Sequence, residues 1–265
     1  EALKLATRYS TSGSFRNQLN YLNLLASIYA ASGKVSQAES IYHSIFEKFR
    51  HNKEADEPFL ADQYLYYAQF LNKTSQKDSA LHYLLKAGEI YHEHPHMQGN
   101  LGDLYSLIGD AWSGKNIEAT TSADFQNQKS KNLLTAVQFY KKALNYLNDT
   151  GDIERMDFPL FKESNFPVQT LRILRDLGIA YHQLAGLTQN DREETRLDYL
   201  NKALNCFTTG SDLAENLRTG FVSEESKVQF TTLQQEIFKL VIRGAYDLHQ
   251  KTHDPHWAEI AFYHS

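Results

Sequence analysis

Apolar and small residues recur at helical spacing in two stretches of the chain, and the second stretch repeats the order of the first. The steps between successive positions are three, one, three, four, five, four and three residues in both stretches. The first set is Leu22, Leu25, Ala26, Tyr29, Gly33, Ala38, Tyr42 and Ile45, and the second is Tyr64, Tyr67, Ala68, Leu71, Ser75, Ala80, Leu84 and Ala87. Steps of three and four place side chains on one helical face. Each copy therefore predicts two helices that meet at a short turn, near Gly33 in one copy and near Ser75 in the other.

The same small-residue contacts can be followed through three further, less regular copies. Two of them carry insertions between their helices, and the first helix of the last copy is expected to begin early, near Ser223, and to be unusually long. The matching positions are Tyr105, Ile108, Gly109, Trp112, Ala136, Tyr140 and Ala143 in the third copy, Leu174, Leu177, Gly178, Tyr181, Leu200 and Ala203 in the fourth, and Ile242, Ala245, Tyr246, His249, Ala258 and Phe262 in the fifth. A helix pair of this kind cannot bury its apolar face alone, so the copies must stack. We predict an all-α superhelix (α-solenoid) of stacked antiparallel helix pairs.

The predicted organisation is a single helical repeat domain over residues 1–265, read as part of a longer protein. Ser36 with Glu39, and Ser75 with Asp78, have the spacing of side-chain caps at the start of a second helix. The strap between the third and fourth copies could be purely structural, or it could be a ligand-like segment that occupies the groove. The parts are 1–16, a remnant helix of a preceding repeat; 17–54, repeat one; 58–95, repeat two; 96–148, repeat three, with an insertion at 114–130; 149–168, the strap; 169–210, repeat four; and 222–265, repeat five, truncated.

The repeated frame resembles the tetratricopeptide repeat, whose first helix carries a large residue, Leu, Gly or Ala, and Tyr, and whose second carries Ala, an aromatic residue and Ala. The resemblance implies a right-handed superhelix. The segment Leu217–Phe230, with Arg218, Phe221 and Ser226, is similar to the last repeats of bacterial proteins in which such an array precedes a CHAT domain, a caspase-like peptidase domain with a His and a Cys as catalytic pair. None of that peptidase domain lies in these residues.

The resemblance implies a protein–protein interaction scaffold that binds a peptide or protein and controls a C-terminal peptidase domain, which it would also contact intramolecularly. A cytoplasmic bacterial protein is implied as well. Two alternatives stay open: a stand-alone adaptor or sensory array of a signalling kinase or transcription regulator, and an oligomerisation scaffold. The reading frame beyond Ser265 would distinguish the peptidase regulator from the adaptor or sensory array. Light scattering would distinguish the oligomerisation scaffold from both.

In the tetratricopeptide family, the first helix of each pair lines the concave groove, so the resemblance assigns a set of polar binding residues. An ordinary solvated helix face is the competing interpretation. The set is Asn20, Asn23 and Ser27 in repeat one; Asp62, Tyr66, Gln69 and Asn72 in repeat two; Asp103, Ser106 and Asp110 in repeat three; and Arg172, Arg175, Asp176 and His182 in repeat four. Ser27 and Asp62 depart from the family's clamp for a peptide carboxylate. The charges suggest a partner that is basic toward repeats two and three and acidic toward repeat four.

Composition and charge narrow the function further. The net charge is −5, with 27 basic and 32 acidic residues and no basic stripe, which argues against nucleic-acid binding. The uncharged stretches are far shorter than the ~20 residues of a membrane span. Cys206 is the single cysteine, so an intrachain disulfide is excluded, and we expect a buried structural thiol.

We expect neither enzymatic activity nor a cofactor. The sequence has no nucleophile elbow, no phosphate-binding glycine loop and no metalloprotease helix motif. Two groups of closely spaced histidines could hold a metal. Histidines near the C-terminal end of a helix more often face water and interact favourably with the negative end of the helix dipole. No metal site is therefore predicted. The groups are His92, His94 and His96, and His249, His253 and His256.

Overall fold

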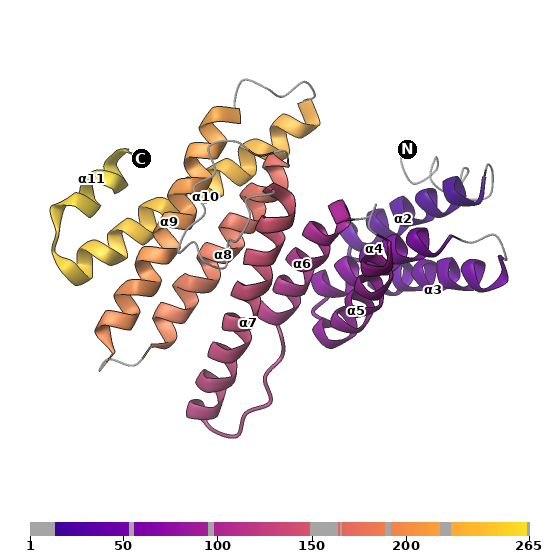
Figure 1. Cartoon of the computed structure of the whole chain (residues 1–265), viewed down its shortest axis with the longest axis horizontal. Coiled ribbons are helices and arrows are strands. Elements are labelled where there is room, and N and C mark those ends of the chain that lie inside the picture. The colour runs from indigo at the N-terminus through magenta and orange to yellow at the C-terminus, as the bar shows by residue number, and fades with distance from the viewer. Residues whose placement is uncertain are drawn as a thin grey trace. The chain divides into compact units, whose positions relative to one another are not determined.

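The computed structural model describes residues 14–52, 56–94, 98–148, 164, 166–188, 192–217 and 224–263. These residues form helices and connecting turns and contain no strand, which confirms the all-α prediction (Figure 1). The helices are α2 (Phe15–Ala31), α3 (Val35–His51), α4 (Glu57–Lys73), α5 (Lys77–Glu93), α6 (Gln98–Ser113), α7 (Ser122–Asn148), α8 (Pro167–Leu187), α9 (Glu193–Leu217), α10 (Glu224–Thr252) and α11 (Pro255–Tyr263). The chain divides into two compact units, Glu1–Gln98 and Gly99–Ser265.

In the first unit, consecutive helices pack as pairs, α2 with α3 and α4 with α5, and α3 also contacts α4. The frame positions that the sequence marks as small are fully buried at these contacts: Ala26, Ala38, Ala68 and Ala80. A small side chain lets two helix axes approach closely, so the partner helix can place a larger residue over it. The first two predicted pairs are therefore present, with the predicted faces inward.

The turns inside the two pairs have the same conformation. Gly33 has φ of 73° and Ser75 has φ of 64°, so both lie in the left-handed region. The next backbone N–H in each turn, that of Lys34 or Gln76, donates over 2.9 Å to the carbonyl of Tyr29 or Leu71, five residues back. This is the long hydrogen bond of the Schellman motif, which satisfies a carbonyl at the end of the first helix.

The predicted side-chain caps of the second helices are wrong. Lys34 and Gln76 occupy the N-cap positions of α3 and α5, and neither makes a side-chain cap hydrogen bond. The left-handed residue reverses the chain so sharply that the next helix begins two residues later. Ser36 therefore lies already inside α3, and Ser75 is the turn residue itself.

In the second unit, glycine takes the place of the small alanine on the first helix of two pairs. A Cβ built on Gly109 of α6 would lie 2.6 Å from the Tyr140 ring of α7, and one on Gly178 of α8 would lie 2.4 Å from the Phe207 ring of α9. Both rings are almost completely buried. Each aromatic residue follows the frame alanine of its helix, Ala136 or Ala203, by four positions, as Tyr42 follows Ala38. The contact between a glycine and an aromatic ring thus recurs in both of these helix pairs.

Three helix ends in the second unit can be compared with the segments that the sequence analysis delimits. Part of the predicted insertion at 114–130 is helical, because α7 begins at Ser122, where the Thr121 Oγ1 accepts from the Asp124 N–H at 3.1 Å. The helix α8 begins at Pro167, a residue with a preset φ that suits a first helical turn. The helix α9 continues to Leu217, beyond the expected end of repeat four at residue 210. Most of the predicted remnant helix (1–16) and most of the predicted strap (149–168) lie outside the described residues.

The two helices of the fifth copy, α10 and α11, contact each other, and the early, long first helix is confirmed. The predicted contact positions of the second helix are wrong, because Ala258 is exposed and Phe262 is 82% exposed.

The predicted register of α10 is wrong by one residue. Ala245 and Leu248 are fully buried, whereas Tyr246 is 57% exposed. Gly244 faces Leu204 and Phe207 of α9. The small position of the frame is therefore Ala245 and not the exposed Tyr246. The two positions are hard to distinguish in the sequence, because Ile242 precedes Ala245 by three residues and Tyr246 by four.

Candidate functional site

The predicted groove face of the first unit lies along α2 and α4, and three of its residues line one pocket. Ser27, Tyr66 and Gln69 meet there around a hollow of about 460 Å3, which Tyr42 and Phe70 also line. Tyr66 is 44% exposed, so part of an aromatic side chain lies at the surface beside this hollow. Burial raises the pKa of Tyr42 to about 12, with a smaller effect from Tyr66. The Tyr42 phenol therefore stays neutral at physiological pH.

Beside this pocket, the structure pairs a predicted residue with one that the sequence did not suggest. The Asn23 Nδ2 of α2 donates to the Gln63 Oε1 of α4 over 2.6 Å. The other two amide atoms, Asn23 Oδ1 and Gln63 Nε2, are buried and have no hydrogen-bond partner within the part of the chain that the structure describes. A buried polar atom without a partner costs about 1–3 kcal/mol, so a group that supplied both missing hydrogen bonds would be favoured here.

The other predicted residues of the first unit have different placements. Asn20 is exposed on α2. Asp62 Oδ1 accepts from the Tyr91 hydroxyl of α5 over 2.8 Å, which ties the carboxylate to its own helix pair. Asn72 is only 7% exposed. Asn72 is therefore part of the packed interior and not of an open groove surface.

In the second unit, the predicted charges face one another across helices. Arg172 of α8 lies 3.6 Å from Asp103 of α6. Arg175 of α8 contacts Asp176 through two hydrogen bonds, of 2.9 and 3.2 Å, and reaches Glu236 of α10 over 2.8 Å. Burial raises the pKa of Asp176 above its usual value, and Arg175 only partly opposes this. Of the residues that suggested a charge-split partner, Asp103 and Arg172 thus face each other, and Arg175 is paired with Asp176 and Glu236.

Two further predicted residues also make contacts between helices. Asp110 Oδ1 accepts from the Tyr140 hydroxyl over 2.9 Å. His182 Nε2 and Asp247 Oδ2 of α10 lie 2.7 Å apart, at the edge of a pocket of about 260 Å3 between α8, α9 and α10. Ser106 is 1% exposed and therefore presents no side chain to a groove. Binding by any of these residues stays a prediction.

Three polar partners on the first helices were missed: Gln63, Glu236 and Asp247. Gln63 could have been noticed, because it is an amide between the apolar positions Phe59 and Tyr67 at helical spacing. Glu236 and Asp247 lie on α10, whose register was assigned one residue off, and no local pattern distinguishes them from solvated surface acids.

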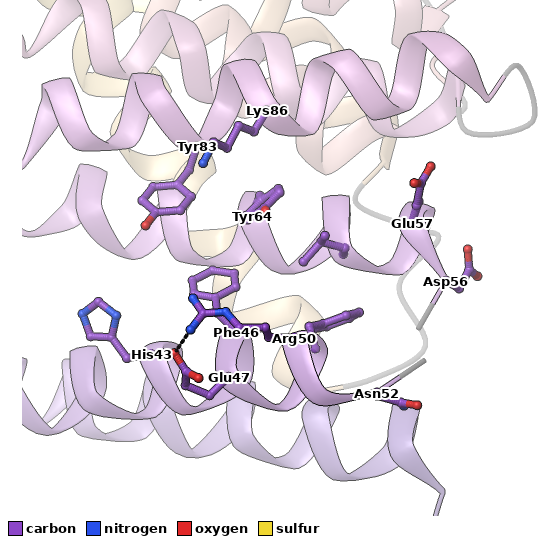
Figure 2. A pocket seen from close by; sticks show the side chains of 12 residues that line it. His43, Phe46, Glu47, Arg50, Asn52, Asp56, Glu57, Tyr64, Tyr83 and Lys86 are labelled. Atoms are coloured by element: carbon purple, nitrogen blue, oxygen red, sulfur yellow. Dashed lines mark hydrogen bonds and ion pairs between the residues drawn. The ribbon is translucent and has the colours of Figure 1, made fainter. Parts of the chain in front are cut away.

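A second hollow of the first unit lies between α3, α4 and α5, with a volume of about 490 Å3. Figure 2 shows the side chains that line it: Phe46 comes from α3, Tyr64 from α4, and Tyr83 and Lys86 from α5. The three ring centroids are 5.4, 5.6 and 5.7 Å apart. No role was predicted for these residues from the sequence.

The single thiol and the histidines are the remaining candidates for chemistry. Cys206 is 2% exposed, as predicted, and burial raises its pKa to about 12, so the thiol is not a nucleophile at neutral pH. Within the described ranges, no three residues among His, Cys, Asp and Glu are grouped so that they could hold a metal ion, although His96 lies outside those ranges. The described helices also include none with the length and apolarity needed to cross a membrane.

The comparisons with known proteins bear on the fold. No family model matches the chain, and no curated protein sequence matches it. Among solved structures, the chain is similar to the crystal structure of BtubC (BKLC) from P. vanneervenii, with a TM-score of 0.51 and 15% sequence identity over 98% of this chain and 86% of BtubC. At that identity, the likeness shows the fold alone. Together with the consecutive helix-pair packing, it supports a helical-repeat-like all-α fold.

Proposed function

We propose that this chain is a protein-interaction scaffold that binds an extended peptide segment of a partner along the face formed by the first helices α2 and α4. The observation that carries the proposal is the pocket of about 460 Å3 in which Ser27, Tyr66 and Gln69 meet. A half-exposed aromatic ring among polar side chains suits a peptide, because the ring provides apolar contact area and the polar groups fix the direction of the backbone.

The neighbouring amide pair supports the same function. Asn23 Oδ1 lacks a donor and Gln63 Nε2 lacks an acceptor. Each peptide unit of an extended segment carries one N–H and one C=O, so a bound backbone has the groups that both amides need. Because both atoms are buried, binding includes a small rotation of the half-buried Asn23 side chain. Recognition through the backbone would make this site tolerant of sequence, and Tyr66 would select for an apolar side chain.

The finer classification belongs to the same proposal. We assign the helix pairs to the tetratricopeptide type, stacked in a right-handed superhelix, on the frame shared by Ala26, Ala68, Gly109 and Gly178. Control of a CHAT-type peptidase domain rests on the resemblance of the segment Leu217–Phe230. The experiment for that part is to express the full reading frame and measure its peptidase activity with and without a peptide bound to the array.

The binding proposal is tested by selecting peptides from a random phage-displayed library against the purified chain and measuring their affinity by fluorescence anisotropy. Replacing Tyr66 by Ala should weaken the selected peptides by roughly ten-fold or more, because a central aromatic contact contributes about 2 kcal/mol or more. Asn23→Ala should weaken them as well, through the lost backbone hydrogen bond.

Phe125→Ala is the matched control, because the Phe125 ring of α7 is 46% exposed and lies outside the groove face. It should leave the affinity unchanged. Circular dichroism melts show whether each variant is folded. Selected peptides that bind folded Tyr66→Ala and Asn23→Ala proteins as tightly as the parent would contradict the proposal, and so would a library that yields no binders.

A further inference from the structure

The hollow between α3, α4 and α5 contains a lysine whose charge has no opposite partner. Lys86 Nζ lies 5.8 Å from the centroid of the Tyr64 ring and 5.6 Å from that of the Tyr83 ring. Both distances are within the range of a cation–π contact. None of the carboxylates in the described part of the chain forms an ion pair with Lys86. The ammonium is therefore held by aromatic faces and keeps its capacity for an anion.

Each acidic residue that lines this hollow lies near a basic group other than Lys86. Glu47 accepts from Arg50 over 2.8 Å, on the same helix, as the dashed line in Figure 2 marks. Asp56 lies 3.1 Å from Arg16. Glu57 lies 3.9 Å from the His94 imidazole, a contact that is an ion pair only when the imidazole is protonated. Of the lysine and arginine side chains that line the hollow, Arg50 is paired with Glu47, whereas Lys86 has no ion pair in the described part of the chain.

The same combination of two rings and a lysine occurs again in the second unit. Lys142 Nζ lies 5.9 Å from the Tyr105 ring and 5.6 Å from the Phe139 ring. Relative to the repeated frame, Tyr105 corresponds to Tyr64, Phe139 to Tyr83 and Lys142 to Lys86. Lys142 likewise has no ion pair with a described carboxylate.

Repeats one and four carry other residues at these frame positions: Leu22, Ile41 and Ser44 in repeat one, and Leu174, Cys206 and Thr209 in repeat four. Helix pairing therefore does not need the two rings and the lysine, since two pairs form without them. Their joint presence in repeats two and three calls for a role beyond packing.

We propose that Lys86, with the rings of Phe46, Tyr64 and Tyr83, forms a binding site for an acidic segment of a partner protein, one in which a carboxylate lies next to an aromatic or aliphatic side chain. The carboxylate pairs with the ammonium, and the neighbouring apolar side chain packs on the rings. A partly desolvated lysine strengthens such a charge-assisted contact relative to one in open water. Lys142, with Tyr105 and Phe139, forms a second site of the same kind. Neither site involves Tyr66 or the Asn23–Gln63 pair, so this surface is separate from the proposed groove.

The test uses three short fluorescein-labelled peptides in which phenylalanine and leucine residues alternate with one variable residue. The variable residue is aspartate in the first peptide, asparagine in the second and lysine in the third. Anisotropy titrations should show the aspartate peptide binding roughly ten-fold or more tightly than the asparagine peptide, which is the expected effect of one charge-assisted hydrogen bond. The lysine peptide should bind most weakly. Raising the salt concentration should weaken the aspartate peptide, because exposed charges are screened.

Variants of the lysine connect the binding to this site. Lys86→Met keeps the apolar stem and removes the charge. If the second site binds equally well, this change should weaken the aspartate peptide only about two-fold, and adding Lys142→Met should remove most of the remaining binding. Lys86→Arg keeps the charge and should preserve binding. Lys48→Met, at an exposed position of α3 that does not line the hollow, changes the net charge equally and should have no effect.

Three results would overturn the proposal. The first is the absence of saturable binding of the aspartate peptide up to roughly 1 mM protein. The second is equal loss of affinity in Lys86→Met and Lys48→Met, which would indicate a general charge effect. The third is tighter binding of the lysine peptide, which would make the rings a cation site. Tyr66→Ala should leave the aspartate peptide unaffected, so failure here and failure of the proposed groove can be told apart.

Discussion

At the scale of single residues, the fold depends on small side chains placed opposite large rings. Gly178 shows this most clearly, since a Cβ at this position would lie 2.4, 2.8 and 2.9 Å from three atoms of the Phe207 ring. Phe207 is 1% exposed, so the ring has no free space to move into. The absence of one methyl group at Gly178 therefore sets the distance between α8 and α9.

Gly178→Ala should lower the free energy of unfolding by about 1–3 kcal/mol, the usual cost of overpacking a core. Gly186→Ala, on the same helix, is the matched control, because a Cβ there meets nothing within 4 Å. That control should be neutral or should stabilise by up to about 1 kcal/mol, as alanine is the better helix former. Urea denaturation of both variants measures the difference. Equal stability of the two would show that the Gly178–Phe207 contact is not as close as described.

The polar residues follow a different rule at this scale. Asp103, Arg172 and Arg175 look like a ligand-binding set in the sequence, yet each has a partner on a neighbouring residue or helix. Ion pairs that are partly exposed contribute little to stability, about 1 kcal/mol or less. Their main effect here is on recognition, because a paired charge is less available to a ligand than an unpaired one such as Lys86.

At the scale of elements, the shared turn of the first two pairs links sequence to geometry. Gly33 and Ser75 occupy the same frame position and the same left-handed backbone region. Glycine adopts that region without a steric penalty, whereas a residue with a Cβ pays roughly 1 kcal/mol or more. Ser75 therefore holds a conformation that its side chain disfavours, and the packing of α4 against α5 compensates for it.

Ser75→Gly should raise the free energy of unfolding by up to about 1 kcal/mol, because the steric penalty at φ of 64° disappears. The reverse change at the equivalent turn, Gly33→Ser, should lower it by a similar amount. Thermal melts of the two variants, monitored by circular dichroism, give the signs. A destabilised Ser75→Gly protein would mean that the serine hydroxyl contributes a contact that outweighs the backbone strain.

Elements were easier to predict where the frame is regular. The pairs α2–α3 and α4–α5 follow it with single-residue accuracy at their buried positions. The helix α10 does not, because an apolar or aromatic residue stands at many of its positions, and two registers of the pattern satisfy the same spacing. Only the packing of Gly244 and Ala245 toward α9 decides between them.

At the scale of the whole molecule, the described helices form two compact units. In helical repeat arrays, each repeat exchanges contacts mainly with its neighbours, so stability is close to a sum of local terms. A perturbation in one repeat is therefore expected to loosen its own surroundings first. The proposed groove uses α2 and α4, and the aromatic–lysine sites use α3 to α5 and α6 to α7, so binding surfaces too are local to a few helices.

Hydrogen exchange of the Gly178→Ala protein checks this locality. Amides of α8 and α9 should exchange faster than in the parent, because their shared core is disturbed, whereas amides of α2 to α5 should be little affected. Exchange measured by mass spectrometry of peptides resolves the two units. Equal acceleration in both would show that the chain opens as one cooperative body.

The sequence by itself determined the helical class, the repeated pairs, the small-residue contacts and the buried Cys206, because helical periodicity and turn chemistry are local properties that neighbouring residues display. Only the tertiary structure decided which polar groups meet. Asn23 and Gln63 are 40 residues apart, Arg175 and Glu236 are 61 apart, and His182 and Asp247 are 65 apart. Such pairs depend on the relative register and rotation of separate helices, which a small change in core packing can alter. For the same reason, the aromatic–lysine sites became visible only when rings from different helices were seen to converge.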